Sequence, residues 1–157
     1  MLIRKPHAEE FDEIYKMGFD VWADGSSLEN YLEECRTSPK YRQGEWFVLE
    51  RNRALLSSLL VHSFADNVYG IGSIATPVDQ RKKGYASALI KSVLNDLQKN
   101  RSSKVTYLYS DINPEFYQRF GFKILPPPLQ KYKTTTCMVC LTDSEINFSK
   151  LSPPPYF

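Results

Sequence analysis

The chain has 157 residues, of which 42% are hydrophobic and 24% charged, a composition typical of one soluble globular domain. Its net charge of +2 is too small for the strongly basic face of a nucleic-acid binder. The N-terminus lacks the apolar segment of a secretory signal, and no apolar run approaches the roughly 20 residues that span a membrane. We therefore expect a cytoplasmic protein with a single domain over residues 1–157, as a monomer or homodimer, with neither nucleic acid nor membrane as partner.

The first half of the chain predicts two helices between strands. Residues 2–6 resemble a short strand, and apolar side chains at three- and four-residue spacing predict a helix from about Glu9 to Trp22. Ser27 is a suitable N-cap for a second helix that Pro39 closes. Residues 45–64 predict two strands joined by a turn at residues 51–53, and residues 67–76 predict another strand.

The second half begins with the clearest helix of the sequence, which starts near Gly84 and carries a continuous apolar stripe to Leu97. A strand follows at residues 104–110, and then a short helix at residues 114–120 that Gly121 closes. Two more strands are expected at residues 122–125 and 134–143. The order β, α, α, β, β, β, α, β, α, β, β predicts a mixed α/β fold with an antiparallel part.

Three features receive plain structural interpretations. Cys137 and Cys140 form a C-x-x-C without the second ligand pair that a zinc site needs, so we expect two small apolar strand residues and no metal. The proline-rich segments at residues 125–130 and 151–157 are expected to be an extended loop and tail, with ligands of a proline-reading domain as the alternative. Gly70, Gly72 and Ala75 fit G-x-G-x-x-A, but Pro77 prevents the helix that a dinucleotide fingerprint requires.

Three consecutive basic residues, Arg81, Lys82 and Lys83, stand directly before Gly84 and the long helix. The first amide N–H groups of a helix have no intrahelical partner, and the positive end of its dipole lies there. Glycine lets the backbone approach a bulky anion. The loop therefore indicates a pyrophosphate cradle, and the alternative is a solvated basic loop that happens to precede a helix.

A resemblance to a known family supports the cradle. Arg81-x-x-Gly84-x-Ala86 matches the R/Q-x-x-G-x-G/A motif of the GCN5-related N-acetyltransferase (GNAT) family. Residues 116–122, FYQRFGF, resemble that family's F-Y-x-x-x-G-F segment. The order of the elements also agrees across nearly the whole chain. The resemblance implies a central mixed, largely antiparallel sheet of six to seven strands, splayed between two parallel strands and flanked by about four helices.

The resemblance also implies an activity, transfer of an acetyl group from acetyl-coenzyme A to a primary amine of a small molecule, peptide or protein. Tyr117 matches the tyrosine that protonates the departing thiolate. Ser110 takes the place of a frequent asparagine, and Asn113 lies nearby, so either side chain could meet the pantetheine arm. The remaining expected cofactor-binding residues are the end of the strand and the loop with the first helical turn: Ile74, Ala75, Thr76, Arg81, Lys82, Lys83, Gly84, Tyr85, Ala86 and Ser87.

The general base and the amine stay open. The central strand lacks the glutamate that family members often use, and the candidates for the base are His62, Asp66, Tyr69 and Asp111. An acidic cluster beside Trp22 and Tyr31 suits a cationic amine, or is a solvated helix face; it comprises Asp20, Asp24, Glu29, Glu33 and Glu34. The alternative to an enzyme is a non-catalytic module that binds coenzyme A or docks a partner.

Overall fold

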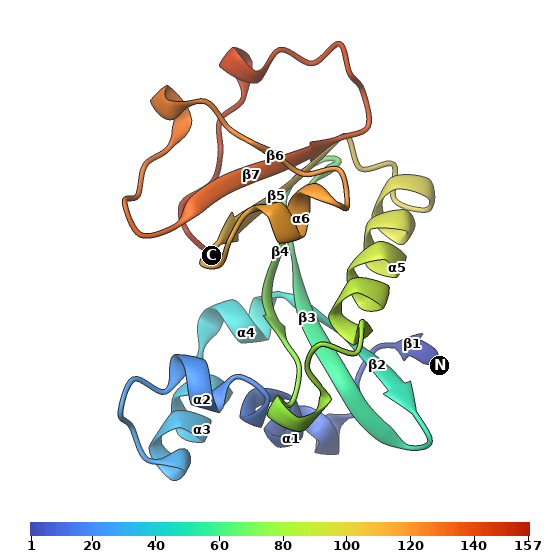
Figure 1. Ribbon diagram of the computed structural model, residues 1–157, viewed down its shortest axis with the longest axis vertical. Helices are drawn as coiled ribbons and strands as arrows, with labels where there is room; N and C mark the ends of the chain where they lie inside the picture. Colours follow the sequence, from blue (N-terminus) through green and yellow to red (C-terminus); the bar gives the residue numbers. More distant parts are fainter. The chain divides into compact units, whose positions relative to one another are not determined.

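The computed structural model describes all residues, 1–157, and contains one seven-stranded sheet in the order β1-β2-β3-β4-β5-β7-β6 (Figure 1). β4 and β5 pair in parallel, whereas β1 with β2, β2 with β3, β5 with β7 and β6 with β7 pair antiparallel. The strands are β1 Leu2–Arg4, β2 Glu45–Arg51, β3 Ala54–Ala65, β4 Val68–Ala75, β5 Val105–Ser110, β6 Lys123–Ile124 and β7 Thr136–Leu141. This is the expected mixed, largely antiparallel sheet.

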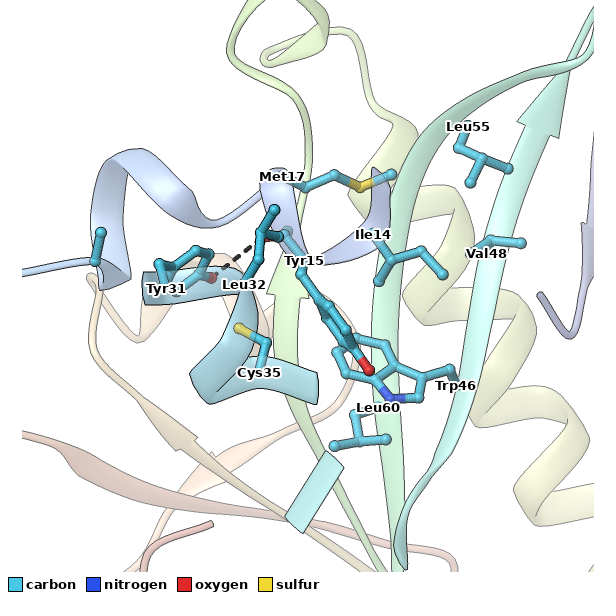
Figure 2. Close-up of a cluster of buried hydrophobic side chains, with 12 residues drawn as sticks. Ile14, Tyr15, Met17, Tyr31, Leu32, Cys35, Trp46, Val48, Leu55 and Leu60 are labelled. Carbon is cyan, nitrogen blue, oxygen red and sulfur yellow. Dashed lines mark hydrogen bonds between the residues drawn. The ribbon is translucent and has the colours of Figure 1, made fainter. Parts of the chain in front are cut away.

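The chain divides into two compact units, and the first comprises Met1–His62 and Ser73–Val93. Its short helices are α1 Phe11–Lys16, α2 Phe19–Trp22, α3 Leu28–Thr37 and α4 Pro39–Gln43. Their apolar faces pack with β2 and β3 into a buried cluster that includes Ile14, Trp46 and Leu60 (Figure 2). In the same cluster the Tyr31 hydroxyl donates a hydrogen bond to the Tyr15 carbonyl at 3.1 Å, which ties α3 to α1.

The expected helix from Glu9 to Trp22 is divided into a 3-10 turn, α1 and α2. The division falls at Gly18, where an added Cβ would lie 2.0 Å from the Trp22 ring. Absence of a side chain at this position therefore lets the Trp22 ring fold back over the backbone. The Ser27 cap is confirmed, because its hydroxyl accepts a hydrogen bond from the Asn30 amide at 3.2 Å.

Pro39 closes α3, as expected, and then occupies the first position of α4, where its missing N–H costs nothing. The Ser38 hydroxyl caps α4 by accepting from the Tyr41 amide at 3.3 Å. The division at Gly18 and this extra helix explain why six α-helices are present where about four were expected.

The second unit comprises Ser63–Gly72 and Leu94–Phe157. Its best-paired strands are β5 and β7, which run antiparallel from Val105↔Leu141 to Ser110↔Thr136. Helix α6, Glu115–Gln118, follows β5, and Gly121 has the left-handed φ of +95° expected of a residue that closes a helix. Helix α5, Tyr85–Lys99, begins in the first unit and ends in the second. No helix of the chain is both long and apolar enough to cross a membrane.

Candidate functional site

The loop between β4 and α5 brings the basic residues to the N-terminus of a 15-residue helix. After the 3-10 turn Val78–Gln80, Lys82 and Gly84 both adopt left-handed conformations, with φ of +63° and +84°. The first helical hydrogen bond runs from the Ala88 amide to the Gly84 carbonyl at 3.0 Å. The amides of Tyr85 and Ala86 precede that bond, so the helix itself offers them no acceptor. The geometry is suited to an anion.

Gly84 supplies both the conformation and the space that an anion needs. A Cβ built on Gly84 meets no atom within 4 Å, so the side of the loop where that Cβ would point is open. A left-handed φ disfavours other residues there, because Cβ comes close to the following carbonyl oxygen. Lys82 has the same kind of φ without being glycine, which costs about 1 kcal/mol.

The Arg81 side chain is turned away from the helix N-terminus and toward Asp20. Its terminal nitrogens donate to the two Asp20 carboxylate oxygens at 2.7 and 2.8 Å, and its Nε donates to the Thr76 carbonyl at 2.9 Å. The ion pair lowers the pKa of Asp20 and raises the pKa of Arg81. Arg81 therefore braces the loop, whereas Lys83 lies on it with its ammonium group donating to Gln80 at 3.2 Å.

The three residues expected to contact pantetheine, Ile74, Ala75 and Thr76, differ in the direction of their backbone groups. The Ala75 carbonyl accepts from the Ser57 hydroxyl of β3 at 2.9 Å, so the backbone groups of Ala75 face β3. Successive residues of a strand direct their backbone groups to opposite edges. The backbone groups of Ile74 therefore face the edge away from β3, where a ligand could pair with them. This assignment favours Ile74 over Ala75, and Thr76 lies just beyond the end of the strand.

Ser73 is a residue of this site that the sequence did not reveal. It has a left-handed φ of +48° although it lies inside β4, which is a local distortion of the strand of the kind found at bulges. Such a residue redirects the amides that follow it. No sequence pattern predicts a left-handed serine inside a strand, and only the nearby glycines, Gly70 and Gly72, indicated an unusual backbone there.

Tyr117 lies on α6 in the second unit and is 9% exposed. Its ring packs edge-on against Phe116 and Phe122, at centroid distances of 5.0 and 6.4 Å. Burial, and secondarily the nearby charge of Asp111, raises the pKa of Tyr117 to about 12. The phenol is therefore fully protonated at neutral pH and is able to donate a proton.

Ser110 and Asn113, the two residues expected near the pantetheine, both have local structural partners. The Ser110 hydroxyl donates to the Ile112 carbonyl at 2.7 Å, and the Asn113 side-chain oxygen accepts from the Glu115 amide at 3.0 Å. The Asn113 bond fixes the turn that leads into α6. Both bonds leave the other half of each polar group, the Ser110 lone pairs and the Asn113 amide hydrogens, available for a ligand.

The four candidates for the general base differ in setting. Burial lowers the pKa of His62 to about 4, with Lys40 adding to the effect, so a neutral imidazole there binds a proton weakly. Asp66 is exposed in the turn between β3 and β4, and Tyr69 lies in β4. Asp111 accepts a hydrogen bond from the Tyr156 hydroxyl at 2.7 Å. These settings single out no base.

Arginines neutralise much of the acidic cluster. Asp20 belongs to the Arg81 pair, and Arg36 lies 3.4 Å from Glu33 and 3.9 Å from Glu29. Tyr31 is buried, while the Trp22 side chain stays 39% exposed.

A feature that the sequence did not predict is a pocket of about 420 Å³ in the first unit. It is lined by Lys5, Pro6, Phe11, Tyr15, Tyr41, Arg42, Gly44, Glu45 and Trp46.

The two cysteines of the C-x-x-C are buried residues of β7, as expected, and all three cysteines of the chain are free thiols. Burial raises the pKa of Cys137 to about 11 and also raises the pKa of Cys35 and of Cys140. Each thiol is therefore held in its protonated, unreactive form at neutral pH.

The mixed sheet with its parallel pair β4–β5 defines the fold class, and a comparison with family profiles identifies the family. The profile described as acetyltransferase (GNAT) domain matches residues 2–125. The chain belongs to the GNAT acetyltransferase family. No curated protein sequence matches it.

Three solved structures with the same fold are distant in sequence from this chain. N-acetylglutamate synthase from Neisseria gonorrhoeae, complexed with coenzyme A and N-acetyl-glutamate, is 15% identical with a TM-score of 0.69. The match covers 90% of this chain and 35% of that one. PaiA N-acetyltransferase from Thermoplasma acidophilum, complexed with coenzyme A, is 15% identical with a TM-score of 0.69. That match covers 89% of this chain and 98% of the PaiA chain. A spermidine N-acetyltransferase SpeG chimera from Vibrio cholerae and hSSAT is 15% identical with a TM-score of 0.67. The match covers 90% of this chain and 96% of the chimera.

Proposed function

We propose that this protein transfers the acetyl group of acetyl-coenzyme A directly to a primary amine of a small molecule, peptide or protein. The observation that carries the proposal is the cradle at Gly84. Open space, a left-handed loop and the unpaired amides of a helix N-terminus meet at one point, with three basic residues directly before it. The pyrophosphate of coenzyme A has the charge and the size for such a site.

We assign the pyrophosphate to the backbone of residues 81–87, with charge from Lys82 and Lys83, and the pantetheine arm to the free edge of β4 at Ile74 and to Thr76 just beyond it. Arg81 holds the loop through Asp20 and Thr76, so its contribution is chiefly to shape the cradle. Ser110 and Asn113 offer the polar groups that their local hydrogen bonds leave available. Each contact restricts the arm, and positioning of this kind supplies much of the rate of acyl transfer.

Bound acetyl-coenzyme A supplies an acetyl group activated as a thioester. Amides at the distorted end of β4, near Ile74 to Thr76, polarise the carbonyl oxygen. Tyr117 donates its phenolic proton to the sulfur as the carbon–sulfur bond breaks, and solvent restores that proton. The attacking amine must be neutral, so its own proton passes to a base or a water chain. Tyr117 meets one requirement of an acid, because its pKa of about 12 keeps the phenol protonated at neutral pH.

The direct test is release of free thiol from acetyl-coenzyme A across a panel of primary amines, with identification of the acetylated product by mass spectrometry. The panel includes spermidine and glutamate, because the similar structures are a spermidine N-acetyltransferase chimera and a synthase with N-acetyl-glutamate bound. Thiol release that requires an amine supports acetyl transfer. Binding of acetyl-coenzyme A with no product from any amine would contradict it.

A second candidate is a non-catalytic module that binds coenzyme A or docks a partner. The observation that favours it is the lack of a well-placed base, since the pKa of His62 is about 4 and Asp111 accepts from Tyr156. Calorimetry with coenzyme A, run beside the amine panel, separates the two candidates. Tight binding without turnover is the result expected of a sensor.

The remaining expectations form part of the proposal. We propose that residues 1–157 act as a single functional domain, in the cytoplasm, as a monomer or homodimer. Gel filtration combined with light scattering measures the oligomeric state, and fractionation of cells that produce the protein measures its location. The proposed reaction uses no metal, so activity should be unchanged after dialysis against a chelator.

A further inference from the structure

The proline-rich tail at residues 151–157 is fastened to the second unit by its backbone. The Lys131 ammonium group donates to the Pro153 carbonyl at 3.1 Å, and the Tyr109 hydroxyl of β5 donates to the Pro154 carbonyl. Consecutive prolines leave the chain few alternative conformations, so little entropy is lost when these bonds hold it in place. The tail is therefore a preorganised part of the fold.

The aromatic end of the tail is also anchored. The Tyr156 amide donates to the Tyr132 hydroxyl at 3.0 Å, and the Tyr156 hydroxyl donates to the Asp111 carboxylate at 2.7 Å. Asp111 is the residue whose charge contributes to the raised pKa of Tyr117, the proposed acid. The end of the tail therefore binds the carboxylate whose charge also acts on the proposed acid.

Phe157 lies against the glycine backbone of β4. A Cβ added to Gly70 would lie 2.5 Å from the Phe157 ring, and a Cβ added to Gly72 would lie 3.5 Å from it. Phe64 of β3 and Tyr109 of β5 flank the ring at centroid distances of 5.0 and 5.5 Å. This contact gives the G-x-G of residues 70–72 a packing role. The first of the two glycines leaves room for two aromatic rings directly on the strand, because its added Cβ would also lie 2.7 Å from the Phe64 ring.

We propose that Phe157 is a specificity-determining residue that limits the size of the acceptor amine. The inference rests on the proposed acetyl transfer. Gly70 and Gly72 directly precede the distorted end of β4 that we assign to the thioester, and the tail is tied to the Asp111 beside the proposed acid. A ring fastened there occupies volume that a bulky acceptor would need. Every residue from Pro153 to Tyr156 has an anchoring bond or lies next to one, so the Phe157 ring is held in place on Gly70 and Gly72.

The test uses three single variants. Phe157→Ala removes the ring. Gly70→Ala adds a methyl group that must displace the same ring and also the Phe64 ring beside it. Gly72→Ala is the matched control, because its methyl group would make only ordinary contact with the ring. The probes are a pair of amines with one chain length, n-butylamine and 4-phenylbutylamine, together with the amines found by the panel and their aryl-substituted analogues. The measured quantity is the ratio of kcat/KM for the bulky amine to that for the small one.

We expect Phe157→Ala and Gly70→Ala to raise this ratio at least tenfold, since a pocket discriminates by about 10- to 200-fold per methylene-sized change. Gly72→Ala should keep the wild-type ratio. A ratio unchanged in Phe157→Ala, in an enzyme that still acetylates the small amine, overturns the size-limiting role and leaves acetyl transfer standing. Absence of transfer to every amine by the wild-type protein overturns both proposals.

The stability of the same variants tests the contact itself without using activity. Gly70→Ala should lower the midpoint of thermal unfolding in the wild-type background, and the loss should be smaller when Phe157 is already alanine. Equal losses in both backgrounds would show that the Phe157 ring does not rest on Gly70, and would overturn the inference independently of any amine.

Discussion

Arg81 and Asp20 form a two-bonded ion pair that joins the basic loop to α2, with donor–acceptor distances of 2.7 and 2.8 Å. The arginine that the family motif places at the cofactor is thereby fixed by a carboxylate 61 residues earlier in the chain. Its remaining bonds, to the carbonyls of Thr76 and Met17, complete a brace under the loop.

Substitutions of Asp20 and of Arg81 should lower the stability of the protein by different amounts. Asp20→Asn should lower the free energy of unfolding by up to about 1 kcal/mol, because the pair is more than one-third exposed and water screens it. Arg81→Ala should cost more, since it also removes the bonds to two carbonyls. Arg81→Lys should fail to restore stability, because an ammonium group cannot make the bidentate contact. Urea unfolding measures all three, and full recovery with lysine would contradict the brace.

Gly84→Glu should abolish binding of coenzyme A, because the new side chain brings bulk and negative charge to the proposed pyrophosphate site. Gly25→Glu is a matched control. Gly25 has a φ of +83°, against +84° for Gly84, and a Cβ at either position meets no atom within 4 Å. The two substitutions therefore impose the same backbone strain. Calorimetry should show binding in the Gly25 variant alone, and unchanged affinity in folded Gly84→Glu would exclude the cradle.

Tyr117→Phe should reduce turnover by roughly ten- to a thousandfold and leave affinity for acetyl-coenzyme A almost unchanged. The substitution keeps the ring and its packing on Phe116, and removes only the proton. Tyr107→Phe is the control, because Tyr107 is another buried tyrosine of the second unit with a pKa of about 12. Steady-state kinetics should show the loss at residue 117 only. A wild-type rate in Tyr117→Phe would make this tyrosine a packing residue.

His62 should make stability depend on pH. Its pKa is about 4 in the folded protein against 6.5 in the unfolded chain. The unfolded chain therefore binds more protons between these values, and stability falls as the pH is lowered through this window. Lowering the pH from 7.5 to 5 should cost up to about 2 kcal/mol. His62→Gln should lose much less over the same interval in urea unfolding, and an equal loss would assign the dependence to other groups.

The order of the elements could be predicted from the sequence because it depends on local patterns, such as the spacing of apolar residues and the residues that cap helices. The apolar stripe from Tyr85 to Lys99 and the cap at Ser27 are of this kind. The division at Gly18 was missed, since it follows from a ring four residues later that folds back over the glycine. The periodicity of apolar residues predicts which face of a helix is buried, but it does not predict where a side chain packs against the backbone.

The candidate site was predictable in position and only partly in chemistry. The left-handed loop at Gly84 follows from the type of residue, so the motif locates it. The commitment of Arg81 to Asp20 and the left-handed Ser73 both result from tertiary contacts. Those contacts cannot be read from a single sequence, so the motif locates the loop that we assign to the ligand and does not identify which side chains would touch it.

The three buried thiols have a practical consequence for measuring this protein. Aromatic disulfide reagents react with thiolates, and Cys35, Cys137 and Cys140 are buried with raised pKa values. The native protein should therefore give almost no background colour at neutral pH, and the thiol of released coenzyme A can be followed continuously in the same cuvette. The same reagent would report unfolding, because denaturation exposes three reactive groups per chain. One spectrophotometric signal thus distinguishes a variant that is slow from a variant that has lost its fold.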